Sequence, residues 1–251
     1  MSCAFVADSN RAIQVSASAM SINPPSVTVV RIRYNTMDLI GTVVKSSRQY
    51  DSSRRQRQAE LARERILAAA RTRFLAAGYA ATTVAAVAVD ADVSVETIYK
   101  NFGGKPGLVR ALWERALAGR GPVPAPVRSD AMSEVEADAE QMLRKWAKLA
   151  AEVSFLGAPI MLLVRAAATG DEAMATLLAE AEQERLTRMR HNAKRLLRTG
   201  GVRPGLGLAQ VTDVLWMFSA AEQYELLVLR RNWTRSRYAA FVGDAMVAAL
   251  L

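Results

Sequence analysis

Residues 82–113 read TTVAAVAVDADVSVETIYKNFGGKPGLVRALW, and this stretch decides the fold. Apolar residues at helical spacing predict one short helix over 83–91 and a second over 95–102. One of the two threonines that open the stretch can cap the first helix, and Ser94 can cap the second. In both cases a side-chain oxygen accepts from backbone N–H groups of the first turn. The pattern therefore predicts two short helices joined by a tight turn, which is a helix-turn-helix.

A helix-turn-helix places its second helix in the major groove of DNA, with the first-turn side chains against base edges. Such a helix needs apolar residues on its inner side, polar residues on its outer side, and a free N-terminal end near phosphate. The residues that can pack inward are Val87, Val93, Ile98 and Phe102. The residues that can face outward are Ser94, Val95, Glu96, Thr97 and Lys100, with Lys105 following at the start of the next helix.

Helices are expected on both sides of this element. Residues 59–77 contain no Gly or Pro and carry apolar residues largely on one side, and Gly78 is expected to end that helix. Pro106 suits the first turn of a further helix that runs to about Gly119. After a Pro- and Gly-rich connector, further helices are expected over 130–151, 155–169, 171–199, 206–230 and 234–250.

The fold class predicted from these patterns is all-α. The expected organisation is a helix-turn-helix domain over 51–118, including its linking helix, and a second helical domain over 130–251. Residues 1–50 are rich in Ser, Val and Asn and show little helical periodicity, so they are expected to form a mostly disordered arm. The internal Met20 and Met37 leave the true start codon open.

Charge is concentrated toward the N-terminal end. The 251-residue chain has a formal net charge of +9, and seven of these nine excess positive charges lie in the first 115 residues. Such asymmetry favours a half that faces nucleic acid, although a basic surface without a specific partner would look the same.

Composition argues against several other classes. One His and one Cys leave no converging acid, base or nucleophile set, so we expect neither an enzyme nor a metal or cofactor site. No apolar run is long enough to span a bilayer and no secretory signal is evident. We therefore expect no membrane partner and a cytoplasmic location.

Residues 64–80, ERILAAARTRFLAAGYA, together with 82–113 closely resemble the DNA-binding domain of TetR-family transcriptional regulators. The resemblance covers about residues 57–115 and rests on motifs in a fixed order. These are a first helix ending in F-x-x-x-G-Y, a T-T-V start, a V-S-x-x-T-I-Y core and a following F-x-x-K. Asp92 departs from the pattern, because Gly is usual there in a left-handed turn. Asp adopts that conformation more readily than most residues, so the turn is expected to form.

The resemblance implies which residues touch DNA. Thr83, Tyr99 and Lys105 would contact phosphate, and Lys100 or Asn101 could also reach DNA. Ser94, Val95, Glu96 and Thr97 would lie at the groove face, where Glu96 could accept from a cytosine amino group. Arg54, Arg55 and Arg57 could bind the adjoining backbone or minor groove. Two simpler alternatives stay open: Tyr99 as a packed helix residue and the arginines as a solvated charge run.

The C-terminal half resembles the ligand-sensing and dimerisation domain of the same family. Met and aromatic residues could line a pocket for a small apolar effector, although such residues are also typical of a core. The pocket candidates are Trp146, Phe155, Met161, Trp216 and Tyr224. His191 is expected to be a surface residue without a ligand role.

Helices 206–230 and 234–250 could form a four-helix bundle between two copies of the chain. The expected seam consists of Val211, Leu215, Phe218, Leu226, Phe241, Met246 and Leu250. The function predicted is that of a homodimeric repressor, released by its effector from a palindromic operator in double-stranded DNA. Activation, or a non-specific architectural DNA-binding protein, are the alternatives. The sequence identifies neither the effector nor the operator.

Overall fold

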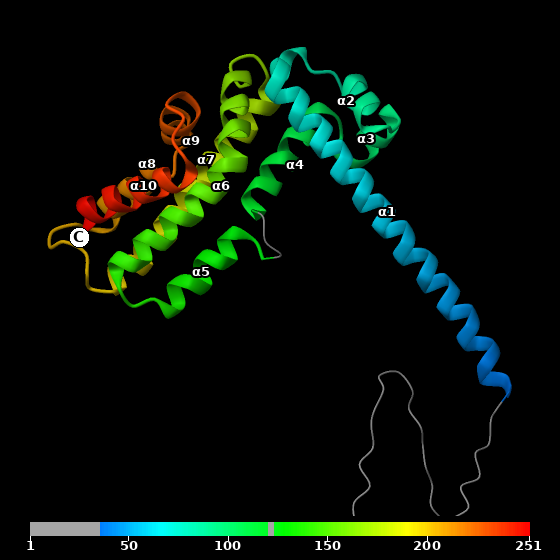
Figure 1. Ribbon diagram of the computed structural model, residues 1–251, viewed down its shortest axis with the longest axis horizontal. Helices are drawn as coiled ribbons and strands as arrows, with labels where there is room; N and C mark the ends of the chain where they lie inside the picture. The colour runs from blue at the N-terminus through cyan, green and yellow to red at the C-terminus, as the bar shows by residue number, and fades with distance from the viewer. Residues whose placement is uncertain (1–35, 120–122) are drawn as a thin grey trace, which may run out of the picture. The chain divides into compact units, whose positions relative to one another are not determined.

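The computed structural model describes the backbone of residues 36–119 and 123–251, and the side chains of 54–119 and 123–251. Within these ranges the regular elements are helices, which confirms the all-α prediction (Figure 1). They are α1 (Thr36–Ala81), α2 (Val84–Ala91), α3 (Val95–Phe102), α4 (Lys105–Ala118), α5 (Ala125–Val135), α6 (Ala139–Ala167), α7 (Glu172–Arg198), α8 (Leu208–Phe218), α9 (Ala221–Tyr224), the π-helical η1 (Glu225–Arg230) and α10 (Arg235–Leu250).

The predicted N-terminal arm falls in two parts. Residues 1–35 lie outside the described residues. Residues 36–50 belong to α1, so this part of the expected disordered arm is helical. Residues 56–251 form one compact unit, and the following description concerns that unit. The division of the unit into two functional domains stays a prediction.

The two short helices form as their capping residues predict. The Thr83 Oγ1 accepts from the backbone N–H of Ala86 at 3.1 Å, and the Ser94 Oγ accepts from that of Thr97 at 3.1 Å. Asp92, which ends α2, has φ 52° and ψ 54°. The left-handed turn therefore forms with Asp in place of Gly, and the helix-turn-helix geometry is kept.

A first hydrophobic core joins α1, α2, α3 and α4 to the facing sides of α6 and α7. Phe74, Val87 and Ile98 are fully buried in it, whereas Val93 and Phe102 are half-buried. Helices α6 and α7 contribute Ile160, Met161, Val164, Met174, Leu177 and Ala181 to the same core. Each large apolar side chain buried there contributes about 1.5–3 kcal/mol. The helix-turn-helix is therefore held against the helical body by apolar packing.

A second core lies among α6, α7, α8 and α10. It corrects the expected dimer seam, because Val211, Leu215, Met246 and Leu250 are buried inside this chain's own core and cannot meet a second copy. Phe218 is half-buried against the same core. Of the expected seam only Leu226 and Phe241 are substantially exposed, at 51% and 42%.

Several helix boundaries differ from those expected. The helix expected over 130–151 is interrupted at residues 136–138, where the Asp138 Oδ1 accepts from the backbone N–H of Gln141 at 2.7 Å and starts α6. Conversely, the helices expected over 130–151 and 155–169 are joined, because α6 runs without a break from Ala139 to Ala167. Its packing against α4, α7 and α10 outweighs the loss of one backbone hydrogen bond at Pro159. The helix expected over 206–230 ends at Ser219 and resumes as α9 and η1.

Helix α6 is long and apolar enough to meet the length and composition criteria for a membrane span. A central helix of a helical protein meets the same criteria. Here α6 packs against α4, α5, α7 and α10, and it contributes buried residues to both cores. We therefore interpret α6 as the central helix of the body (Figure 1).

Candidate nucleic-acid interface and ligand cavity

Helix α3 turns its predicted DNA-contacting side chains away from the core. It buries Ile98, while Val95, Glu96, Tyr99 and Lys100 are exposed. Ser94 and Asn101 are also exposed, and Thr97 is half-buried. The helix-turn-helix therefore presents the predicted groove-facing set on one outer surface, although contact with DNA stays a prediction.

Part of this polar set is already engaged within α3. The hydroxyls of Ser94 and Thr97 lie 2.9 Å apart, and the Asn101 Nδ2 donates to the Thr97 carbonyl at 2.7 Å. These bonds hold the first turn in a fixed geometry. Glu96 and Lys100 take no part in these bonds and are exposed.

Tyr99 is 55% exposed, so the packed alternative does not describe it. Its ring lies against Gly104, which has φ 109°. A Cβ at that position would stand 3.0 Å from the ring Cε1. Gly104 thus allows both the turn after α3 and the close approach of the Tyr99 ring.

Lys105 is held more closely than the resemblance implies. Its Nζ donates to the Tyr79 carbonyl at 3.0 Å and lies 4.2 Å from the centre of the Tyr79 ring. An ammonium has three N–H donors, so a contact with phosphate stays compatible with this arrangement. The structure adds a second role, in which Lys105 ties the start of α4 to the end of α1.

The three predicted arginines Arg54, Arg55 and Arg57 lie exposed on α1. No sequence pattern indicated a role for two other arginines of the same helix. The guanidinium of Arg63 lies 4.6 Å from the centre of the Phe102 ring, and Arg73 makes a two-point ion pair with Asp90 of α2 at 2.5 and 2.7 Å. The Arg73 guanidinium holds the pKa of the Asp90 carboxyl below its usual range. Both contacts fix α1 against the helix-turn-helix.

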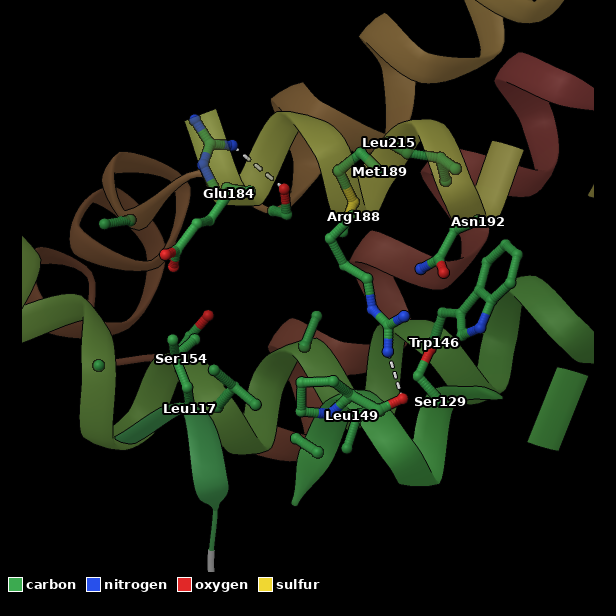
Figure 2. Close-up of a pocket in the computed structure, with 18 of the residues that line it drawn as sticks. Leu117, Ser129, Trp146, Leu149, Ser154, Glu184, Arg188, Met189, Asn192 and Leu215 are labelled. Carbon is green, nitrogen blue, oxygen red and sulfur yellow. Dashed lines mark hydrogen bonds between the residues drawn. The ribbon is translucent and has the colours of Figure 1, made fainter. Parts of the chain in front are cut away.

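A cavity of about 620 Å³ lies in the helical body between the two cores (Figure 2). Helices α4, α5, α6, α7, α8 and α10 all contribute to its wall. Of the five pocket candidates, Trp146 and Met161 line it. Phe155 is partly exposed instead, beneath the guanidinium of Arg235. Trp216 is likewise partly exposed, beneath the guanidinium of Arg185. Tyr224 is buried against Tyr238, with the two ring centres 5.2 Å apart.

His191 is exposed, as expected of a surface residue, and it is also among the residues that line the cavity. Its Nε2 lies 3.1 Å from the Asp130 Oδ1, and Arg188 donates to the same carboxylate at 3.0 Å. No local sequence pattern indicates this arrangement, because α5 and α7 meet only in the folded chain.

Helix α4 belongs to both the DNA-recognition surface and the cavity. It follows α3 after Gly103-Gly104, and its residues Trp113 and Leu117 line the cavity. The Trp113 ring packs over Gly157 of α6, where a Cβ would stand 3.0 Å from its Cζ3. A molecule in the cavity would therefore touch α4, the helix that directly follows the recognition helix α3 in the chain.

Polar contacts connect the same two parts. The Arg71 Nη1 donates to the Leu156 carbonyl at 2.9 Å, and Arg110 pairs with Glu180 at 2.7 Å. Burial and a hydrogen bond to the Asp171 carboxylate raise the pKa of Tyr79 to about 12. Asp171 also caps α7, because its Oδ1 accepts from the backbone N–H of Met174 at 3.0 Å. Helix α7 thus meets the helix-turn-helix domain at its first residue and lines the cavity further along.

These features define a helical regulator with a helix-turn-helix for DNA. Residues 66–112 match the family model described as "Bacterial regulatory proteins, tetR family". The matched residues run from the later part of α1 through α2 and α3 into α4, which is the stretch whose motifs resemble that family in the sequence.

Solved structures share the fold over most of their length. FadR from Bacillus subtilis in complex with stearoyl-CoA has a TM-score of 0.59 and 15% identity, covering 74% of this chain and 97% of that one. The fatty acid degradation regulator FadR from Bacillus halodurans has a TM-score of 0.58 and 15% identity, covering 73% of this chain and 93% of that one. PfmR from Thermus thermophilus has a TM-score of 0.55 and 18% identity, covering 73% of this chain and 95% of that one. No curated protein sequence matches the chain.

Proposed function

We propose that this regulator is a sequence-specific repressor that a small-molecule effector releases from a palindromic operator. The observation that carries the proposal is the dual position of α4, which follows the recognition helix and also lines the cavity through Trp113 and Leu117. If the cavity binds a molecule more tightly in one orientation of α4 than in another, the molecule shifts the equilibrium between these two orientations. The shift is limited to that difference in affinity.

The operator would be palindromic if the protein acts as a two-fold dimer. Two recognition helices then meet half-sites one helical turn apart, roughly 34–36 Å. We place the dimer contact on the last helices, as the sequence suggested, but on their exposed apolar residues. These residues are Trp216, Met217, Leu226, Leu229 and Phe241.

The effector would be largely apolar, because Leu149, Val153, Met161 and Phe218 line much of the cavity. FadR of Bacillus subtilis was solved with stearoyl-CoA, which makes a long alkyl chain one candidate for the apolar portion. As a regulator of transcription the protein would act in the cytoplasm, where bacterial DNA is held.

The test is binding of the purified full-length protein to labelled DNA from its own upstream region, against a scrambled fragment, at about physiological salt. Specific readout predicts a preference of roughly a thousandfold or more, with a footprint of two related half-sites. Glu96→Gln should change the preferred bases, whereas Lys100→Ala should weaken binding to all fragments alike.

Equal binding to both fragments would point to an operator elsewhere or to an architectural protein. Selection from random DNA separates these outcomes. A selection that returns no motif would establish the non-specific alternative and refute the repressor.

A further inference from the structure

Helix α5 forms one wall of the cavity, and the side that it turns toward the body consists of small residues. Its buried residues are Ala125, Ser129 and Ser133, which follow one another at a spacing of four. Ala125, Pro126 and Ser129 line the cavity. The contact between this helix and the body therefore buries little apolar side-chain volume.

The larger apolar residues of α5 do not compensate for this. Val127 is 53% exposed and Val135 is 83% exposed, while Met132 is half-buried against the second core. Within the two cores of the described residues, α5 contributes no fully buried residue, whereas α4, α6, α7, α8 and α10 each contribute several. Packing of an apolar face is the main source of stability for a helix in a protein, so α5 is held less firmly than its neighbours.

Polar contacts hold α5 in place instead. Arg128 makes two hydrogen bonds to Glu152 of α6, at 3.0 and 2.7 Å. The Arg188 side chain extends from α7 across the cavity (Figure 2), and it donates to the Asp130 carboxylate at 3.0 Å and to the Pro126 carbonyl. Both ion pairs are partly exposed to water. Ion pairs of this kind contribute little to stability and are weakened by salt.

The wall formed by α5 is therefore the one that opens at the lowest free-energy cost. Local opening in proteins begins where few apolar contacts are buried. Movement of α5 breaks polar contacts that water can replace, whereas movement of α4, α6 or α7 exposes large apolar residues of the cores. We propose that α5 is the moving wall through which molecules enter and leave the cavity. This inference rests on the proposed effector site and assigns its route of access.

Amide hydrogen exchange of the full-length, ligand-free protein measures the opening itself. Relative to their rates in an unfolded chain, the amides of residues 129–135 should exchange about a hundredfold faster than those of residues 142–152 in α6. Asp130→Asn weakens the contacts with Arg188 and His191 and should raise exchange in α5 about threefold. Asp244→Asn is the matched control, because Asp244 pairs with Arg144 between α10 and α6, and it should leave α5 unchanged.

Stopped-flow fluorescence with Nile red, an uncharged apolar dye, measures passage into the cavity. Val153→Trp places a larger side chain in the cavity wall, so the signal that it abolishes is the signal of dye inside the cavity. Neither Arg128 nor Asp130 is among the described residues that line the cavity. The double variant Arg128→Gln/Asp130→Asn should therefore raise the association and dissociation rate constants together, by about tenfold, and leave the Kd unchanged.

A covalent link between α5 and α7 should have the opposite effect. Asp130 and His191 lie in contact and are both accessible, and Cys3 is the one native cysteine. The variant Cys3→Ser/Asp130→Cys/His191→Cys can be joined by a short bis-maleimide. Because His191 lines the cavity, the linked protein is compared with the same variant left unlinked. We expect the link to slow both dye rate constants at least about tenfold.

Equal exchange in α5 and α6 would overturn the inference, and unchanged dye rates after linking would place the entrance elsewhere. A dye signal that Val153→Trp leaves intact would also overturn it, because an opening onto an apolar cavity must admit the dye. None of these measurements involves DNA. If α5 opens and admits the dye while no ligand alters operator affinity, the moving wall stands and the proposed induction fails. If a ligand releases the operator while the link leaves its entry unchanged, the repressor stands and the moving wall fails.

Discussion

Tyr79→Phe tests whether α7 is joined to the helix-turn-helix domain through the Tyr79 hydroxyl. Tyr79 is 7% exposed, and its phenol donates to the Asp171 carboxylate that caps α7. The substitution removes that one hydrogen bond and leaves the ring, including its contact with Lys105. A hydrogen bond to a charged group contributes about 1.5–3 kcal/mol. Because Asp171 keeps its bond from Met174, we expect a loss of about 1–2 kcal/mol in the free energy of unfolding at pH 7.

The same substitution should change the response to alkaline pH. Folded Tyr79 keeps its proton up to a pKa of about 12, against 10.0 for a free phenol. Between these values the folded state binds more protons than the unfolded state, so the free energy of unfolding falls as pH rises. A shift of two pKa units corresponds to a contribution of about 3 kcal/mol to the free energy of unfolding. This contribution is present in full below pH 10 and is lost by about pH 12. Burial raises the pKa of Tyr238 to about 12 as well, so Tyr79→Phe should remove only part of the decline.

The assay is urea unfolding followed by circular dichroism at pH 7 and at several values from pH 9.5 to 11.5. Tyr99→Phe is the control, because Tyr99 is 55% exposed and its substitution should leave the free energy of unfolding at pH 7 unchanged. Tyr238→Phe should reduce the alkaline slope without involving α7 and the helix-turn-helix domain. The reasoning is refuted if Tyr79→Phe unfolds within about 0.5 kcal/mol of the wild type at pH 7 and keeps its full alkaline decline.

Three further predictions concern the turn, the core and DNA. Asp92→Ala should destabilise the folded protein by about 1 kcal/mol, because Ala is strained at φ 52°. In thermal unfolding, Asp92→Gly should have a Tm equal to or above that of the wild type. Equal Tm values for the two variants would contradict the left-handed turn. Leu215→Ala should lower the free energy of unfolding by about 2–5 kcal/mol, because Leu215 is buried. Leu226→Ser should leave folding nearly unchanged and weaken self-association, as measured by sedimentation velocity. A dimer that Leu226→Ser does not weaken would mean that the contact lies elsewhere. Lys100→Ala should reduce the slope of log affinity against log salt by about one per protomer in DNA binding, and an unchanged slope would place Lys100 away from phosphate.

Most of the helix-turn-helix was predictable because its determinants are local. The bounds of α2 and α3 follow from Thr83 and Ser94, whose side chains bond to backbone groups only three residues away. The left-handed turn follows from the backbone preferences of Asp92 itself. Such interactions are nearly the same whatever the remainder of the chain does.

The cavity was less predictable, because it depends on which helix faces meet. Met and aromatic residues at helical spacing indicate an apolar face but not what covers it. Of the five pocket candidates, Trp146 and Met161 line the cavity, whereas Phe155, Trp216 and Tyr224 lie elsewhere. No pattern singled out Trp113 or Asn192 as cavity residues, since only the packing of α4 and α7 in the folded chain brings them to its wall.

The all-α class, the helix-turn-helix and its resemblance to the TetR family follow from the sequence alone, because caps, turns and short-range periodicity act over a few residues. Only the tertiary structure decided that α6 continues through Pro159, that Val211 and Leu215 face inward, and that α4 joins the recognition helix to the cavity. These outcomes depend on packing between segments far apart in the chain. There the burial of apolar surface outweighs local preferences, and no single stretch of sequence contains both partners.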